Sequence, residues 1–188
     1  VGFGINLVRS PDNTIRDNVV ALNGANGITL VSECSGVRCE TPPNSDGNTI
    51  EGNTVADNGG TGIQLGWSDS NTIKGNTLMR NLVHGLAPYD SDNNTIRENY
   101  ADSNLNSGFV VESGAGNIFT GNEAEYGGAI STLSASPVIT SNAIDRNTAT
   151  ASGGEIYGKT NSSPTITNNT ITANSANYGG GVYIWNNS

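Results

Sequence analysis

The chain has 188 residues, a formal net charge of −9 and a charged fraction of 13%, about half of what an average globular domain carries. This acidic balance disfavours nucleic acid and anionic membranes as partners, because both attract Lys and Arg side chains. Cations and neutral sugars remain compatible with it. The sequence has no apolar run of about 18 residues, so we expect no membrane span.

The first recognisable elements are Gly-Ile-Asn-Leu at Gly4 and Gly-Ile-Thr-Leu at Gly27, which lie 23 residues apart. Further along, two markers repeat with the same step. Asn-Thr-Ile or the related Asn-Ile-Phe begins at Asn48, Asn71, Asn94 and Asn117, and glycine before an apolar residue recurs at Gly62, Gly85 and Gly108. An internal repeat of this length indicates a solenoid, in which each repeat stacks on its neighbours.

The step between Asn13 and Asn48 is 35 residues, which is twelve more than the regular step. We interpret residues 33–44 as a loop extruded from this coil. Two thiols make a poor zinc site, since structural zinc takes four ligands, so we predict a disulfide between Cys34 and Cys39. A disulfide indicates an oxidising compartment. We therefore expect a secreted, extracellular or cell-surface protein, with the periplasm as an alternative.

Within one coil, short apolar bursts are separated by Asn and Gly. No burst is long enough for a helix, and the 3.6-residue period is absent. We predict three short strands per coil, centred in one coil on Ile73, Leu78 and Leu86. Strands that pair with their equivalents at about 4.8 Å build a parallel β-helix. The predicted fold is all-β, a single solenoid domain over residues 1–188 with about eight coils of roughly 23 residues.

Stacking places equivalent residues in lines along the solenoid. The predicted inward lines are Ile15, Ile50, Ile73, Ile96, Phe119, Ile139 and Ile166; Val20, Val55, Leu78, Ala101, Ala124, Ile144 and Ile171; and Ile5, Ile28, Ile63, Leu86 and Phe109. The predicted asparagine columns are Asn18, Asn53, Asn76, Asn99, Asn122, Asn142 and Asn169; Asn23, Asn58, Asn81, Asn104, Asn147 and Asn174; and Asn13, Asn48, Asn71, Asn94 and Asn117, followed by Pro137 and Pro164.

Two physical reasons explain asparagine at these positions. Stacked side-chain amides hydrogen-bond along a column, and asparagine tolerates the left-handed backbone that a sharp corner needs. We therefore expect asparagine ladders at the turns. Residues 1–125 follow the regular repeat, whereas residues 126–188 form glycine-rich variant coils with a longer step.

The copies of NTIxxNxxxxNxxxGIxL across residues 13–112 resemble the right-handed parallel β-helix repeats of the pectin-lyase-like superfamily. They are most similar to its periplasmic copper-binding and carbohydrate-binding repeats. The stretch SPTITNNTITANSANYGGGVYI near the end is similar to repeats of secreted surface proteins. The resemblance implies right-handed coiling but leaves the function open, because this fold hosts lyases, hydrolases, epimerases, adhesins and inert spacers.

The resemblance also implies that enzymes of this fold place acids and a base in a groove on one outer face. The candidate cluster here consists of Gln64, Trp67, His84, Tyr89, Asp90 and Glu112. A sugar would stack on Trp67 and Tyr89 and contact Gln64. The candidate catalytic residues are His84, Tyr89, Asp90 and Glu112, which could handle protons. The alternative is that these residues simply occupy an outward strand face.

Two metals need consideration. Asp46, Asp69 and Asp92 each lie two residues before an Asn-Thr-Ile triplet and should stack on one turn. They are either turn-forming side chains or a calcium site made of carboxylates and carbonyls. Copper needs His, Met or Cys ligands, and the chain offers only His84, Met79 and two cysteines. We therefore disfavour copper and assign no cofactor, with calcium as the remaining candidate.

The sequence favours an extracellular β-helical scaffold or surface module that contacts a polysaccharide without catalysis. The first alternative is a polysaccharide-active enzyme, a lyase, epimerase or hydrolase. The second is a subunit that stacks end to end into a filament or surface layer. Neither end shows the polar cap that solenoids normally have, so we expect either a segment of a longer solenoid with flanking domains or self-association through the ends.

Overall fold

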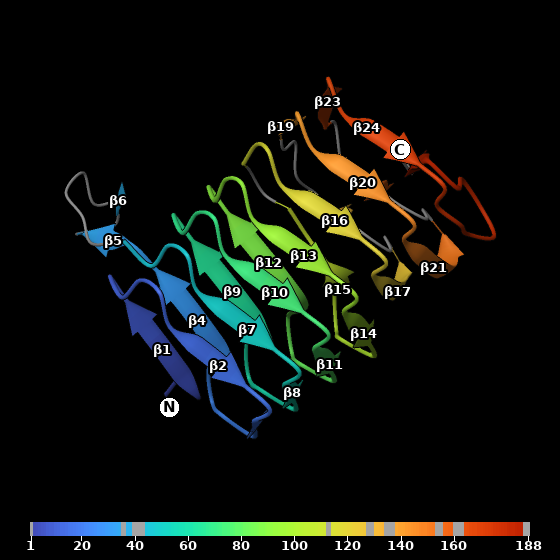
Figure 1. Ribbon diagram of the computed structural model, residues 1–188. Coiled ribbons are helices and arrows are strands. Elements are labelled where there is room, and N and C mark those ends of the chain that lie inside the picture. Colours follow the sequence, from blue (N-terminus) through green and yellow to red (C-terminus); the bar gives the residue numbers. More distant parts are fainter. Residues whose placement is uncertain are drawn as a thin grey trace.

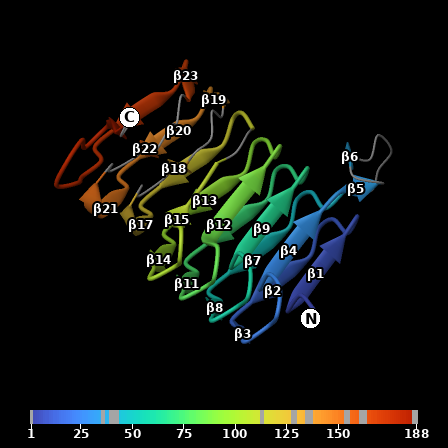
Figure 2. The ribbon, with the colours of Figure 1, turned by 180° about the vertical axis from the view of Figure 1, so that it is seen from behind.

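The computed structural model describes residues 2–34, 37–38, 44–111, 114–126, 130–133, 138–152, 156–159 and 164–185. Short strands joined by turns stack into an elongated solenoid, with the two chain ends at opposite ends of the stack (Figure 1). The same stack is visible from behind in Figure 2. All strand pairs between coils are parallel within the described residues, which confirms the predicted parallel β-helix.

Three long sheets run along the solenoid. Sheet A contains β1 (Ile5–Val8), β4 (Ile28–Val31), β9 (Ile63–Gly66), β12 (His84–Tyr89) and β15 (Ser107–Phe109). Sheet B contains β2 (Thr14–Arg16), β7 (Thr49–Glu51), β10 (Thr72–Lys74), β13 (Thr95–Arg97), β16 (Ile118–Thr120), β20 (Ala143–Asp145) and β24 (Thr170–Thr172). Sheet C contains β3 (Val19–Ala21), β8 (Thr54–Ala56), β11 (Thr77–Met79), β14 (Tyr100–Asp102), β17 (Glu123–Tyr126) and β21 (Thr148–Ser152).

Three smaller sheets complete the described structure. They contain β18 (Ile130–Leu133), β22 (Ile156–Lys159) and β25 (Val182–Trp185); β19 (Val138–Thr140) and β23 (Thr165–Thr167); and β5 (Glu33–Cys34) and β6 (Val37–Arg38). The last pair is an antiparallel hairpin in the predicted extruded loop. Cys39 lies outside the described residues, so the disulfide with Cys34 stays a prediction.

The core is a narrow column of aliphatic and aromatic side chains. Thr-Ile-x strands form readily because β-branched residues suit a pleated, half-buried surface, and their central isoleucines point inward. Ile50, Ile73 and Ile96 are fully buried and stack in register. Each buried aliphatic side chain stabilises the fold by about 1.5–3 kcal/mol. A few such residues per coil can therefore hold the solenoid together without helices.

The last coils correct the predicted alignment. Phe119 pairs with Ile144 and Ile144 with Ile171, so these residues continue the first inward line. Ile139 and Ile166 pair only with each other, on β19 and β23. The sequence prediction placed both lines one strand too early in these coils, because Ile139 and Ile144 lie five residues apart, the same spacing that separates the sheet B and sheet C strands of a regular coil. The second line continues instead from Ala124 to Ala149.

The additional strands also lower the number of coils. The longest sheet has seven strands, fewer than the eight coils that a constant step of 23 residues predicts. Successive ladder asparagines are 25 residues apart from Asn117 to Asn142 and 27 apart from Asn142 to Asn169. The twelve extra residues between Asn13 and Asn48 and the longer coils that contain β19 and β23 therefore both reduce the number of turns that the chain makes.

The asparagine columns form hydrogen-bonded ladders with one direction. The Asn76 N–H donates to Asn99 Oδ1 at 3.0 Å, and Asn76 Oδ1 accepts the Asn53 N–H at 2.9 Å. The Asn76 Nδ2 group also donates to the Ile50 carbonyl oxygen at 2.9 Å. Asn53, Asn76 and Asn99 are almost completely buried. The Asn76 side chain therefore satisfies two main-chain groups of the preceding coil, and its Nδ2 group also donates to the Asn99 Oδ1 atom of the next coil at 3.0 Å. These bonds matter because an unpaired buried polar group is costly.

The ladders follow the corrected alignment. The three ladders are Asn13, Asn48, Asn71, Asn94, Asn117, Asn142 and Asn169; Asn18, Asn53, Asn76, Asn99, Asn122, Asn147 and Asn174; and Asn23, Asn58, Asn81 and Asn104. The first ladder thus continues through Asn142, where the sequence prediction placed Pro137. Proline has no N–H to donate, and a ladder needs one at every rung.

The corners correct a second expectation. The ladder asparagines do not adopt the left-handed conformation. The residue immediately before each of them does, as at Ser70, Gly75 and Arg80, whose φ angles are 57°, 60° and 51°. The left-handed residue turns the chain, and the asparagine that follows, such as Asn71 or Asn76, is buried at the corner. Asparagine is therefore selected here for its amide group rather than for its backbone freedom.

The glycine marker has a steric cause. A Cβ atom on Gly62 would lie 2.6 Å from the Gly85 carbonyl oxygen and 2.9 Å from Asn81 Nδ2. Real Cβ atoms do not approach backbone so closely, so any other residue would push adjacent coils apart. The regular glycine at or just before the start of each sheet A strand therefore permits close approach of the main chains.

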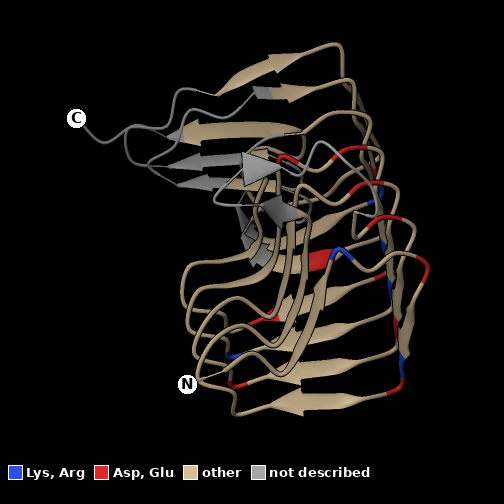
Figure 3. Cartoon of the chain, turned by 90° about the vertical axis from the view of Figure 1, so that its left-hand side faces the viewer, with Lys and Arg blue, Asp and Glu red and all other residues tan. Residues whose placement is uncertain are grey.

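Charged residues lie mainly at the bends and strand ends of the solenoid (Figure 3). Lys74 Nζ lies 3.1 Å from Glu51 Oε1 on the outside of sheet B. Arg80 donates two hydrogen bonds to Asp57, at 2.8 Å and 2.7 Å. These hydrogen bonds lower the pKa of Asp57 and raise that of Arg80. Exposed pairs of this kind contribute little to stability.

We predict that Asn76→Ala lowers the free energy of unfolding by about 3 kcal/mol, because it leaves the buried Asn53 N–H and Ile50 carbonyl groups without their partners. Urea unfolding followed by circular dichroism measures the change. Asn93→Gly is the matched control, since Asn93 is an exposed turn residue with a φ of 56° and glycine occupies the equivalent position at Gly116. Similar losses in both variants would contradict the role of the ladder.

Candidate functional site

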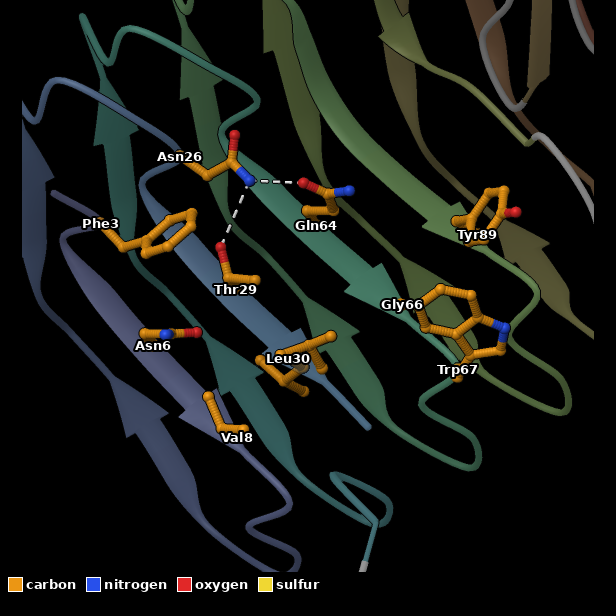
Figure 4. A pocket seen from close by; sticks show the side chains of 11 residues that line it. Phe3, Asn6, Val8, Asn26, Thr29, Leu30, Gln64, Gly66, Trp67 and Tyr89 are labelled. Atoms are coloured by element: carbon orange, nitrogen blue, oxygen red, sulfur yellow. Dashed lines mark hydrogen bonds between the residues drawn. The ribbon is translucent and has the colours of Figure 1, made fainter. Parts of the chain in front are cut away.

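A groove lies on the outer face of sheet A and has a volume of about 670 Å³. Eleven residues from the first four coils line it, and Figure 4 shows their arrangement. Three are aromatic, namely Phe3, Trp67 and Tyr89. The polar side chains include Asn6, Asn26, Thr29 and Gln64, and none of the eleven lining residues is charged. The groove therefore combines apolar rings with neutral hydrogen-bonding groups.

Trp67 and Tyr89 form the wall of the groove at the carboxyl end of the strands. Gly66 pairs with Tyr89, which places Trp67 beside Tyr89 on the neighbouring coil. The ring centroids are 5.2 Å apart and the planes meet at 88°, an edge-to-face contact. Trp67 has a φ of 50°, which is uncommon for a bulky residue. Arg9 and Asp90 occupy the equivalent corners of other coils and have φ angles of 50° and 43°. This is therefore a regular corner of the solenoid, and here it carries an indole ring.

A chain of amide hydrogen bonds organises the opposite side of the groove. The Thr61 N–H donates to Asn26 Oδ1 at 2.9 Å. This bond fixes the orientation of the Asn26 amide, whose Nδ2 group donates to Gln64 Oε1 and, at 3.4 Å, to Thr29 Oγ1. Asn26 comes just before β4 and Gln64 lies within β9. The two side chains meet because adjacent coils are in register.

The structure brings together part of the predicted cluster. Gln64, Trp67 and Tyr89 all line the groove. His84 lies at the start of β12, the far end of the strand from Tyr89, and is not among the lining residues. Asp90 follows Tyr89 at a corner with a φ of 43° and does not line the groove either. Glu112 lies outside the described residues.

Sequence reasoning missed several residues of the groove, in particular Phe3, Asn6, Asn26 and Thr29. A signal for two of them was present. Asn6 pairs with Thr29 and Thr29 with Gln64, so the three occupy one outward column. Extending the column of Gln64 backward through the repeat would have found them. Phe3 and Asn26 precede their strands, where the alternation of inward and outward residues gives no prediction.

The aspartate row has a structural explanation. Asp46 Oδ1 accepts the Asp69 N–H at 2.7 Å, and Asp69 Oδ1 accepts the Asp92 N–H at 2.8 Å. Asp92 Oδ1 in turn accepts the Ala115 N–H at 2.8 Å. One carboxylate oxygen of each residue is thus engaged in linking coils. Among the described residues, no group of three or more His, Cys, Asp or Glu residues could hold a metal ion, and the calcium site stays a prediction.

The comparisons with known proteins identify the family. The model of the family described as "Periplasmic copper-binding protein (NosD)" matches residues 1–124 and 44–188. The chain therefore belongs to this family. Its right-handed β-helical fold confirms the predicted pectin-lyase-like resemblance. Membership in this periplasmic family also confirms the expected location outside the cytoplasm. The described part of the chain has no helix with the length and hydropathy that crossing a membrane requires.

Among solved structures, the crystal structure of the periplasmic alginate epimerase AlgG is similar, with 18% sequence identity and a TM-score of 0.49. The match covers 97% of this chain and 35% of the epimerase chain. This chain therefore spans about a third of the length of that protein. The search of curated proteins found no match.

Copper, which the family description names, does not fit the described residues. Copper sites combine several His, Met or Cys ligands, whereas the described residues supply only one of each, and His84, Met79 and Cys34 lie in three different sheets. His84 Nδ1 is buried and has no hydrogen-bond partner within the described structure. A single imidazole nitrogen is an insufficient donor set, so we derive no copper chemistry for this chain.

Burial lowers the pKa of His84 below its ordinary value of about 6.5. As the pH falls below this value, the unfolded chain binds the proton first. The free energy of unfolding should therefore decrease between about pH 6.5 and the lower folded-state pKa, with no contribution to the slope above that window.

We predict that His84→Gln makes the stability less sensitive to pH in this window. Urea unfolding of both proteins at about pH 7.5 and about pH 5.5 measures the effect. The wild type should lose more stability than the variant on acidification, because only the wild type buries a titrating ring. An equal loss in both proteins would contradict the buried, neutral state of His84.

Proposed function

We propose that this chain is an extracytoplasmic β-helical module that binds a glycan in the groove of sheet A without catalysing a reaction. The observation that carries the proposal is the edge-to-face pair of Trp67 and Tyr89 beside an organised row of neutral polar side chains. Ligand sites are typically concave surfaces in which apolar rings supply contact area and a few placed polar groups supply orientation. Sugars match this surface, because they combine an apolar ring face with many hydroxyl groups.

The positions of the acids and the histidine support binding rather than catalysis. A general acid or base must lie within hydrogen-bond reach of the reacting group. His84 and Asp90, the two described candidates for proton transfer besides Tyr89, are not among the lining residues. Tyr89 does line the groove, but none of the other lining residues is a base that could accept a proton from its phenol. The enzymatic alternative would require Glu112 or a reorganised groove.

The first test is binding by the aromatic wall. Affinity electrophoresis in gels that contain soluble plant or bacterial polysaccharides should retard the wild type. Trp67→Asn, which keeps a residue suited to the left-handed corner, and Tyr89→Ala should weaken binding by roughly tenfold each, about 1.4 kcal/mol. Tyr100→Ala is the matched control, because Tyr100 is 41% exposed and Tyr89 is 36% exposed, but Tyr100 lies on sheet C.

Two results would contradict the proposal. One is unchanged mobility of the wild type with every polysaccharide tested. The other is equal weakening by the Tyr100 and Tyr89 variants. Incubation with pectate and alginate, followed by absorbance at the unsaturated uronate band, tests the alternative. Product formation that is lost in Asp90→Asn or His84→Gln would favour the enzyme.

A further inference from the structure

We propose that the groove selects uncharged sugars and that Asn26 fixes Gln64 as the hydrogen-bond donor that recognises them. This inference rests on the proposed glycan binding and adds the class of glycan and the residues that determine it. Three observations carry it: the neutral lining, the orientation of the Gln64 amide, and the alignment of polar side chains along the solenoid.

The lining disfavours acidic sugars. Uronic acid polymers carry a carboxylate on every ring, and burying a carboxylate requires charged or convergent hydrogen-bond donors. Proteins usually supply Arg or Lys for this purpose. The groove has neither among its lining residues. Arg9 follows Val8 in the sequence but is not part of the lining, and the net charge of the chain is −9. The long-range field therefore also repels a polyanion.

The orientation of Gln64 follows from its partners. The Thr61 N–H can only donate, so Asn26 must present its Oδ1 atom to it. The Asn26 Nδ2 group then points to Gln64, which must present its Oε1 atom. This leaves the Gln64 Nε2 group as a fixed donor with no hydrogen-bond partner within the described structure, and Figure 4 shows it turned toward the Tyr89 side of the groove. A neutral amide donor suits a hydroxyl oxygen.

The polar row gives the direction of the ligand. Asn6, Thr29 and Gln64 are register partners on β1, β4 and β9, so they are spaced by about 4.8 Å along the solenoid axis. Asn6 is exposed and its side chain makes no hydrogen bond within the described residues. Trp67 and Tyr89 flank the row at the carboxyl ends of the strands (Figure 4). An extended glycan would therefore lie across the strands, with successive rings over successive coils.

The test compares oligosaccharides of equal length by isothermal titration calorimetry with the complete chain. Cellohexaose and mannohexaose are the neutral probes, and hexagalacturonate and a mannuronate hexamer are the acidic probes. We expect at least one neutral probe to bind tenfold or more tightly than both acidic probes. Tighter or equal binding of an acidic probe would overturn the neutral selectivity and leave the proposed glycan binding intact. Absence of binding by all four would overturn both.

Variants then test the two named residues. Gln64→Glu keeps the shape and the acceptor for Asn26 but removes the free donor, so neutral binding should weaken about tenfold. Asn26→Asp removes the donor that orients Gln64 and should weaken neutral binding several-fold. Unchanged affinity in both variants would overturn the assigned roles. Thermal unfolding of each variant verifies that the fold is retained.

A gain of binding provides a result that a structural defect cannot imitate. Asn6→Lys places a cation in the exposed part of the polar row, and we expect measurable, salt-sensitive binding of hexagalacturonate. Val19→Lys is the matched control, since Val19 lies in the same first coil but is exposed on sheet C. No gain in the Asn6 variant, or an equal gain in both, would contradict the position of the ligand in the groove.

Discussion

The solenoid depends on one interaction, the hydrogen bond from the main-chain N–H of each ladder asparagine to the Oδ1 atom of the next rung. The Nδ2 groups are less strictly paired, since the buried Asn71 Nδ2 atom has no hydrogen-bond partner within the described structure. The bonds run in one direction, from the N–H of one rung to the Oδ1 atom of the next, and they continue through coils of different length. Because an unpaired buried amide is costly, the ladders fix which residues of successive coils lie side by side. The extra residues 33–44 and the additional strands β19 and β23 all lie between successive ladder asparagines, so they leave the ladder hydrogen bonds in place.

The groove follows from this alignment. Once the ladders set the register, Asn6, Thr29 and Gln64 fall on one outward column, and Trp67 falls beside Tyr89. The corner at Trp67 uses the same left-handed turn that Ser70 and Arg80 use elsewhere, but it holds an indole ring instead of a small or flexible side chain. The fold thus supplies a regular outer face, and a few residues that depart from the repeat form the groove in which we propose that a glycan binds.

The regular part of the fold could be predicted from the sequence because its step is constant. Counting along the repeat predicts the register of the inward sheet B residues correctly from Ile15 to Phe119. It fails at Ile139 and Ile144, since each is the centre of an equally good short strand. Only the requirement for a ladder N–H distinguishes Asn142 from Pro137. In the site, Gln64, Trp67 and Tyr89 could be predicted from their columns. Phe3 and Asn26 could not, because their positions depend on how the chain enters each strand.

The most direct test of the account is a crystal structure of the chain grown or soaked with cellohexaose or mannohexaose. The account predicts sugar rings that cross β1, β4 and β9 on the outer face of sheet A, with one ring against Trp67 and a hydroxyl oxygen accepting a hydrogen bond from Gln64 Nε2. An oligosaccharide bound on sheet B or sheet C, or one in the groove whose hydroxyls avoid Gln64, would contradict it.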